Sequence, residues 1–108
     1  IEPTCQASIQ QYTRRRDGFD KDRLLFCNPA DGSRRVNITV RLSYDEGKTW
    51  PVSRLVRAEP CAGYSCLTVL ADGSIGLLYE SGTHSGDTIC FARFSLEWLT
   101  DGEDSLGA

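Results

Sequence analysis

Long apolar runs, metal-binding motifs and a strong excess of charge are all absent from this 108-residue sequence. The longest uncharged apolar stretches, at 66–71 and 74–79, are far shorter than the ~20 residues that cross a bilayer, which excludes a membrane span. One histidine and five cysteines without a Cys-x-x-Cys pair match no zinc motif, so we expect no metal and no cofactor. We expect the cysteines to be buried thiols that act as small hydrophobic side chains.

Charge is low overall but unevenly divided along the chain. The net charge of −3 argues against a nucleic-acid-binding protein. Residues 1–58 hold eleven Lys and Arg against seven Asp and Glu, a net charge of +4, whereas residues 59–108 hold one against eight, a net charge of −7. The basic run at 14–16 is followed at once by acidic residues, which favours a solvated loop over an anion-binding surface.

Apolar periodicity predicts strands. The longest alternation places five apolar residues on one strand face: Val36, Ile38, Val40, Leu42 and Tyr44. Segments 66–70 and 75–79 are apolar on both faces, as expected of strands between two layers, and Asp72-Gly73 between them predicts a tight hairpin. Further strands are expected at 7–12, 23–27, 53–57 and 88–95. Because no convincing amphipathic helix is present, we predict an all-β antiparallel fold.

The most informative motif is the turn sequence Ser-x-Asp-x-Gly-x-Thr-Trp at residues 43–50. Ser43 and Asp45 can accept hydrogen bonds from turn amides, and Gly47 can adopt a positive φ. Thr49 completes the motif, and Trp50 can bury its ring beside the hairpin. The motif resembles the Asp-box of sialidases and related β-propellers. A turn-closing role for Asp45 is favoured over a catalytic one.

The resemblance extends over nearly the whole chain. Segments 24–30, 33–41, 62–67, 76–80 and 91–99 are similar in order and spacing to the C-terminal third of exo-α-sialidases (neuraminidases). This resemblance implies an all-β fold of antiparallel four-stranded blades in a six-bladed β-propeller, of which the chain would supply about two. We place the penultimate blade at about 1–58 and the last blade at about 59–100, and we expect the tail at 101–108 to be frayed.

The resemblance also implies a set of site residues. Sialic acid carries a carboxylate on its reacting carbon, which repels an anionic nucleophile, and these enzymes use a tyrosine instead. Tyr64 matches that nucleophile, and Arg35 matches the third of three arginines that clamp the substrate carboxylate. Arg34 is less suitable because alternation turns its side chain to the opposite side from that of Arg35, and Arg41 is less suitable because it lies in the middle of a strand. Glu80 matches a carboxylate that holds the first clamp arginine, with a strand-end surface glutamate as the alternative.

These matches predict an exo-α-sialidase, a glycoside hydrolase that releases terminal α-linked sialic acid with retention through a tyrosyl-enzyme intermediate. The alternative is a non-catalytic Asp-box β-propeller that binds glycans or protein partners. The acid/base aspartate, the glutamate that activates the tyrosine and two clamp arginines lie outside the chain, so we expect the isolated chain to be inactive.

Three kinds of partner are expected. They are a sialylated glycan substrate, the remaining propeller blades from the same or another chain, and further copies that pair with exposed strand edges. We expect no nucleic acid and no membrane partner. The compartment is open, although secreted, periplasmic or lysosomal-type locations are typical of the family.

Overall fold

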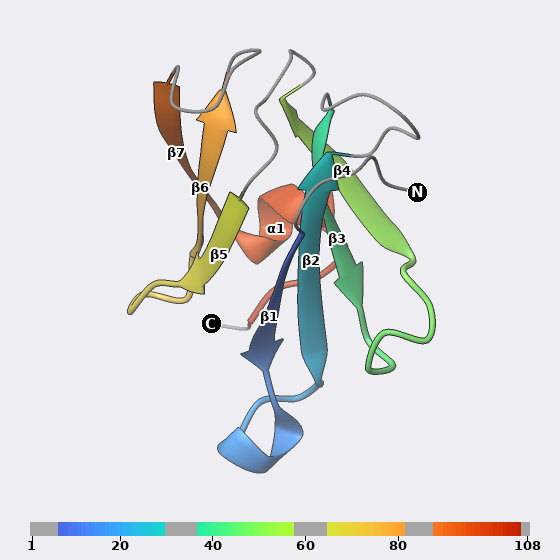
Figure 1. Ribbon diagram of the computed structural model, residues 1–108. Coiled ribbons are helices and arrows are strands. Elements are labelled where there is room, and N and C mark those ends of the chain that lie inside the picture. The colour runs from blue at the N-terminus through green and yellow to red at the C-terminus, as the bar shows by residue number, and fades with distance from the viewer. Residues whose placement is uncertain (1–6, 30–36, 58–64, 82–87, 107–108) are drawn as a thin grey trace.

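The described strands form two antiparallel sheets. The computed structural model describes residues 7–29, 37–57, 65–81 and 88–106. The first sheet contains, in chain order, β1 (Ser8–Thr13), β2 (Arg23–Pro29), β3 (Ile38–Ser43) and β4 (Val52–Arg57). The second sheet contains β5 (Ser65–Val69), β6 (Ile75–Ser81) and β7 (Thr88–Phe94) (Figure 1). Two short helices, η1 (Arg15–Asp17) and α1 (Leu96–Leu99), complete the described elements.

Each strand lies where the apolar periodicity predicts one, so the all-β antiparallel prediction is confirmed. The Asp72-Gly73 pair forms the turn between β5 and β6. Gly73 has a φ of 87°, which a residue without a Cβ adopts at little cost, and its N–H donates to the Leu70 carbonyl over 2.9 Å. The predicted β5–β6 hairpin is therefore confirmed.

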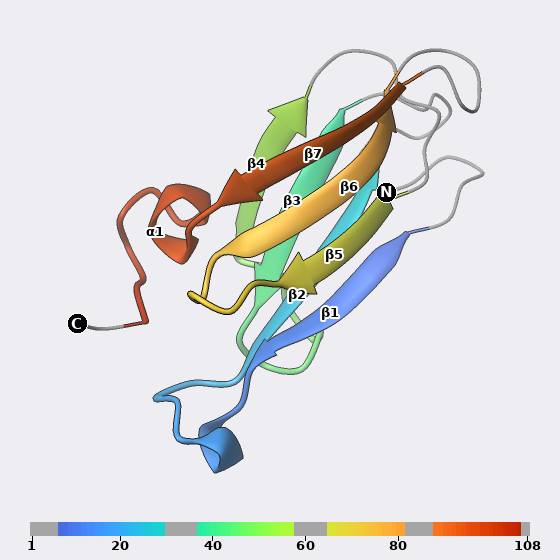
Figure 2. The ribbon, with the colours of Figure 1, turned by 90° about the vertical axis from the view of Figure 1, so that its left-hand side faces the viewer.

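The two sheets pack face to face around one hydrophobic core. Its buried apolar residues are Tyr12, Leu25, Cys27, Ile38, Val40 and Leu42 from the first sheet, Leu67, Ile75, Leu77, Tyr79 and Phe94 from the second, and Leu96 and Leu99 from α1. The sheets are closest at β1 and β5 and diverge toward β4 and β7, where α1 lies between them (Figures 1 and 2). The molecule is therefore a wedge, thin along β1 and β5.

Helix α1 is fixed to the wide side of this wedge. Ser95 caps it by accepting a 3.0 Å hydrogen bond from the Trp98 amide. The guanidinium of Arg54, from β4, donates to the Trp98 carbonyl over 2.8 Å and lies 4.2 Å from the centroid of the indole ring. This hydrogen bond and cation–π contact join the chain after β7 to the edge of the first sheet.

One face of the second sheet differs from the sequence prediction. The apolar pattern of β5 and β6 predicts cover on both faces, and the face toward the first sheet is buried at Leu67 and Leu77. On the opposite face Cys66 and Leu78 are exposed. Within the described part of the chain no third layer covers this face, because both helices and the first sheet lie elsewhere.

The cysteines also depart in part from prediction. Cys27 is fully buried in the core, whereas Cys90 is half-buried and Cys66 is exposed. Burial of every thiol is therefore wrong, because β5 turns Cys66 toward its uncovered face. Cys5 and Cys61 lie outside the described residues.

The C-terminal segment is not frayed over residues 101–106, which corrects the sequence prediction. Asp104 is buried, and its carboxylate accepts hydrogen bonds of 2.8 and 2.9 Å from the guanidinium of Arg23. Its amide donates to the Thr100 hydroxyl over 3.0 Å. Polar composition alone predicts fraying, but a buried cation at the start of β2 supplies the partner that orders this segment.

Candidate functional site

The described strand ends next in sequence to the candidate site residues lie at one end of the two sheets. This end, called the upper end from its place in Figure 1, is where Pro29, Ile38 and Arg57 of the first sheet lie side by side in register. In the second sheet Ser65 pairs with Tyr79 at the same end. The Arg57 guanidinium lies 3.9 Å from the Cys90 sulfur, which connects the two sheets there.

Of the three residues matched to the family's site, the structure describes Glu80. Tyr64 and Arg35 lie outside the described residues. Glu80 is half-buried near the end of β6, opposite Ile89 of β7. By strand alternation it shares the uncovered face of the second sheet with Leu78, two residues earlier. Glu80 therefore lies at the upper end on the side turned away from the first sheet.

The Asp-box lies at the opposite, lower end, between β3 and β4 (Figure 1). The Ser43 hydroxyl donates to the Asp45 carboxylate over 2.7 Å and accepts from the Gly47 amide over 2.8 Å. The Asp45 carboxylate also accepts from the amide and hydroxyl of Thr49, over 2.8 and 2.6 Å. The Trp50 ring lies 5.7 Å from that of Phe26. These bonds hold the turn together.

The hydrogen bonds from Thr49, followed by that from Ser43, lower the pKa of Asp45 to about 2. A carboxylate so stabilised as an anion is a poor proton donor near neutral pH. Gly47 has a φ of 90°, which completes the tight turn. Both the chemistry of Asp45 and its distance from the upper end agree with a turn-closing role.

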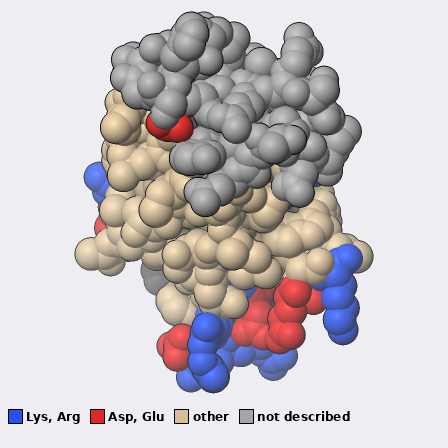
Figure 3. All heavy atoms as spheres, in the orientation of Figure 1, with Lys and Arg blue, Asp and Glu red and all other residues tan. Residues whose placement is uncertain are grey.

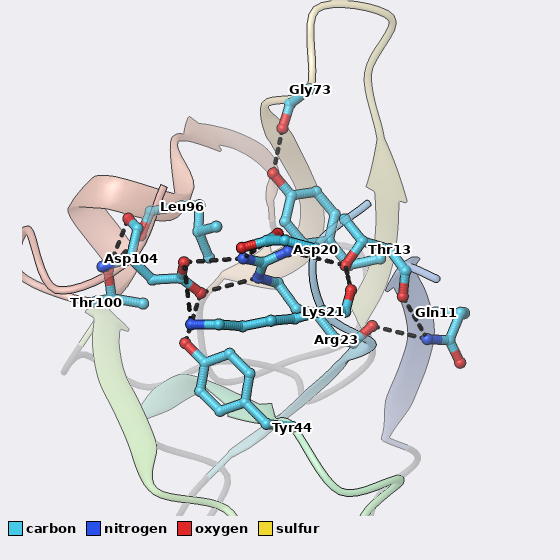
Figure 4. A network of polar contacts seen from close by, with 11 residues as sticks. Gln11, Thr13, Asp20, Lys21, Arg23, Tyr44, Gly73, Leu96, Thr100 and Asp104 are labelled. Atoms are coloured by element: carbon cyan, nitrogen blue, oxygen red, sulfur yellow. Dashed lines mark hydrogen bonds and ion pairs between the residues drawn. The ribbon is translucent and has the colours of Figure 1, made fainter. Parts of the chain in front are cut away.

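A second polar network, which the sequence reasoning missed, centres on Arg23 and Asp104 (Figure 4). Arg23 is fully buried and binds Asp104 with two nitrogens, while a third donates to the Thr13 hydroxyl over 3.2 Å. The Tyr44 hydroxyl donates to the same Asp104 carboxylate over 2.6 Å. Arg23 lies on the same buried face of β2 as Leu25 and Cys27, because the three residues alternate along the strand. This alternation was the sequence signal that Arg23 is buried and needs a partner of opposite charge.

The charges of this network stabilise one another. Hydrogen bonding from Arg23, and then from Tyr44, lowers the pKa of Asp104 to about 2. Burial, reinforced by the bond to Asp104, raises the pKa of Tyr44 to about 12. Asp104 is thus a carboxylate and Tyr44 a neutral phenol at neutral pH. The three groups join β2, the end of β3 and the C-terminal segment, which indicates a structural role.

A third polar cluster closes the β5–β6 turn. The Asp72 carboxylate accepts from the Ser74 amide and hydroxyl over 3.0 and 2.6 Å and pairs with Arg93. These bonds, that from Ser74 first, lower the pKa of Asp72 to about 2. The Tyr12 hydroxyl donates to the Gly73 carbonyl, which joins this turn to β1. Like the Asp-box, the cluster holds a lower-end turn and does not approach Glu80.

Neither a metal centre nor a membrane helix emerges from the described ranges. Among these residues no three His, Cys, Asp or Glu side chains gather in a way that would hold a metal ion. Neither described helix has the length and apolar character needed to cross a bilayer.

Comparison with known proteins decides the family. No protein-family model matches the chain. The sequence is 47% identical over 76 residues to a sialidase from Micromonospora viridifaciens, a match covering 70% of this chain and 11% of that protein. It is 31% identical over 118 residues to an exo-alpha-sialidase from Arthroderma benhamiae, covering 96% of this chain and 28% of that protein. The structure matches Hadza microbial sialidase Hz136 with a TM-score of 0.77 at 37% identity, covering 91% of this chain and 19% of that one.

The chain belongs to the sialidase family. Its two antiparallel sheets are blades of a β-propeller, as the sequence predicts, although the described part of the second blade has three strands instead of four. The chain spans between 11% and 28% of the length of the relatives it matches. Strands β1–β4 lie within 8–57 and β5–β7 within 65–94, while the blade boundaries at about 58 and 100 stay predictions.

Proposed function

We propose that this sialidase chain forms part of an exo-α-sialidase that releases terminal α-linked sialic acid with retention of anomeric configuration. The observation that carries the proposal is the match of 70–96% of the chain to proteins named sialidase or exo-alpha-sialidase. The fold supports it, because Glu80 and Ser65, which directly follows Tyr64, share the upper end of the second blade. The rest of the ring supplies the other catalytic groups.

Tyr64 is proposed as the nucleophile. A neutral phenol approaches the carbon next to the substrate carboxylate without the repulsion that a carboxylate nucleophile meets. A phenol with an ordinary pKa near 10 is a weak nucleophile, so a glutamate from another blade takes its proton during attack. The tyrosyl oxygen bonds to the anomeric carbon as the aglycone leaves with a proton from the acid. Water, which loses its proton to the same acid/base group, then attacks this carbon; the bond to the tyrosyl oxygen breaks, and the glutamate returns the proton to the phenolate. Two inversions give retention.

Arg35 is proposed to bind the substrate carboxylate. Its planar guanidinium is charged at any working pH and donates two parallel hydrogen bonds to the two carboxylate oxygens. Asn37, two residues later in sequence, directly precedes β3 of the first blade, and Tyr64 directly precedes Ser65 at the start of β5 of the second; both strands begin at the upper end. One substrate would thus be held across both blades.

Glu80 is proposed as a positioning residue. Strand alternation places it on the uncovered face of the second blade, where the next blade of a ring packs. The resemblance assigns its partner, the first clamp arginine, to an upstream part of the protein. A carboxylate on this face is suitably placed to orient an arginine that comes from the neighbouring blade.

The test of the proposal is Tyr64→Phe in the complete propeller that carries this chain. Loss of the attacking oxygen is expected to lower kcat on a fluorogenic sialoside by at least about 100-fold, with the Kd of a sialic acid analogue nearly unchanged. Tyr44→Phe is the matched control, because it removes a phenol oxygen at the lower end and should leave kcat unaltered. Full activity of Tyr64→Phe would remove the nucleophile assignment.

A second variant separates catalysis from binding. Arg35→Ala is expected to raise KM and the Kd of the analogue roughly 10- to 100-fold, because a hydrogen bond to a charged group contributes about 1.5–3 kcal/mol. If the complete propeller binds sialosides but turns none over, the non-catalytic alternative is correct instead.

A further inference from the structure

Strand β5, which begins at Ser65, directly follows the proposed nucleophile Tyr64 in sequence. Within the described part of the chain it pairs with β6 alone, and its other edge lies beside β1 of the first sheet (Figure 2). Backbone N–H groups on such an edge have no strand to receive them, so they need another acceptor where they are buried. The group that holds this edge also holds the start of β5.

Ser8 supplies such an acceptor from the other blade. The Leu67 amide donates to the Ser8 hydroxyl oxygen over 3.0 Å, and Leu67 is only 4% exposed, so its amide has little access to water. In the view of Figure 3 the described charged residues gather at the lower end, and the middle over the strands is mostly uncharged, so few charged groups there could replace Ser8. Ser8 is the first residue of β1 and lies opposite Cys27, near the upper end.

A second hydroxyl of β1 contacts the second blade at the opposite end. The Tyr12 hydroxyl donates to the Gly73 carbonyl in the β5–β6 turn. The two bonds come from one strand, but the Ser8 bond reaches β5 two residues after its start, whereas the Tyr12 bond reaches the turn that follows its end. Of the two bonds, the one from Ser8 is therefore suited to fix the part of β5 that comes next after Tyr64 in sequence.

We propose that Ser8 is a positioning residue for Tyr64: its hydroxyl holds the start of β5 against β1 and so sets where the phenol oxygen lies relative to the substrate carbon. The inference rests on the proposed assignment of Tyr64 as the nucleophile. Reacting groups must be held within about 0.5 Å of the productive geometry, and a displacement of about 1 Å can lower the rate about 100-fold. Binding of the substrate carboxylate is assigned to Arg35, which precedes a strand of the other sheet, so loss of the Ser8 hydroxyl should slow attack without weakening binding.

The first test is Ser8→Ala in the complete propeller that carries this chain. Removal of the acceptor is expected to lower kcat on a fluorogenic sialoside by about 10-fold, with the Kd of a sialic acid analogue changed by less than about twofold. Tyr12→Phe is the matched control, because it removes the other β1 hydroxyl that bonds the second blade, and it should leave kcat unaltered. An equal loss of kcat in both variants would indicate general weakening of the contact between the blades and would overturn the proposal.

Two further variants change the hydroxyl at nearly constant side-chain shape. Ser8→Thr keeps the acceptor, Ser8→Val replaces it with a methyl group, and both β-branched side chains suit a strand. We expect Ser8→Thr to retain kcat and Ser8→Val to lose it as Ser8→Ala does, at a temperature where thermal unfolding shows every variant to be folded. Equal kcat values for the Thr and Val variants would show that the hydrogen bond is not what matters, and the positioning role would be wrong.

Hydrogen exchange tests the contact without any turnover. The Leu67 amide is expected to exchange at least about 10-fold faster in Ser8→Ala than in the unmodified propeller or in Ser8→Thr. Faster exchange with full kcat would show that the bond forms but positions nothing in the reaction. Tyr64→Phe separates this result from the proposed function: full activity of that variant removes the nucleophile and this inference together, whereas an inactive Tyr64→Phe beside a fully active Ser8→Ala removes the positioning role alone.

Discussion

At the scale of single residues, a buried ion pair decides how the C-terminal segment is placed. Arg23 is fully buried, and an unpaired guanidinium there would cost several kcal/mol. Asp104 offers both carboxylate oxygens, and Tyr44 donates to one of them. The pair adds little net stability, because its Coulombic attraction is offset by the desolvation of two charges. Loss of one partner is nevertheless costly, because it leaves the other charge buried.

Replacing Asp104 with Asn should therefore be costly. The variant leaves the buried Arg23 with only the exposed carboxylate of Asp20 as a counter-charge, and we expect the free energy of unfolding to fall by about 3–5 kcal/mol in urea titrations at pH 7. Asp20→Asn is the control: Asp20 also bonds Arg23, over 3.2 Å, but is exposed, and its loss should cost less than about 1 kcal/mol. Equal effects of the two variants would show that burial does not set the cost.

The same carboxylate predicts a pH dependence. Its pKa is about 2 in the folded chain against 3.8 for an ordinary aspartate, so its contribution to stability is present above about pH 4 and is lost as the pH falls toward 2. Asp104→Asn should flatten this part of the stability curve, measured by the thermal midpoint from pH 5 to 2. The variant should keep the part of the pH dependence that comes from Asp45 and Asp72, whose pKa values are also about 2.

At the scale of elements, the Asp-box shows how a local motif fixes a turn without outside help. All its hydrogen bonds connect residues 43–49 to one another, so spacing alone is enough to predict them. Its location follows from the strands on either side, which put the turn at the end opposite Glu80. The motif therefore supports the blade.

Ser43→Ala should destabilise this element and leave the chemistry alone. Ser43 is fully buried and accepts from the Gly47 amide, so removal of its hydroxyl is expected to lower the free energy of unfolding by roughly 1–3 kcal/mol. Ser53→Ala, at an exposed position on β4, should change it by less than about 0.5 kcal/mol. The KM of the complete propeller should be unchanged by Ser43→Ala at a temperature where the variant is folded. A changed KM would contradict the claim that the Asp-box turn takes no part in substrate binding.

At the scale of the whole molecule, the described part of the chain is a wedge. Two blades share a core, and α1 fills the gap where they diverge. The described strands that come next after the proposed clamp and nucleophile in sequence, β3 and β5, begin at the same end of this wedge. The resemblance assigns the acid, the base that activates the tyrosine and two arginines to blades outside this chain, and this assignment stays a prediction.

The isolated chain should consequently be inactive. Without a base, no group takes the proton of the proposed nucleophile Tyr64, and without an acid, no group protonates the departing aglycone. General acid and general base catalysis each typically raise the rate by about 10²–10⁴-fold. We expect no release of fluorophore from a sialoside above the buffer rate. Turnover by the purified chain that is abolished by Tyr64→Phe would refute this expectation.

The sequence alone determined the strands, the hairpin at Asp72-Gly73 and the Asp-box, because each depends on residues close together in the chain. It also carried the family resemblance, which the comparisons confirm. Alternation along β3 was sufficient to place Val40 in the core. The site assignment of Tyr64 and Arg35 came from that resemblance and stays a prediction.

Only the tertiary structure decided which polar residues are buried and which apolar sheet face is uncovered. Arg23 and Asp104 are 81 residues apart in sequence, and no local rule pairs a cation in β2 with a carboxylate in a polar tail. The apolar pattern of β6 is the same whether or not a neighbouring blade is present, so sequence predicts cover where the chain leaves Leu78 exposed. Burial depends on what else occupies the surrounding space, and that is a property of the assembled fold.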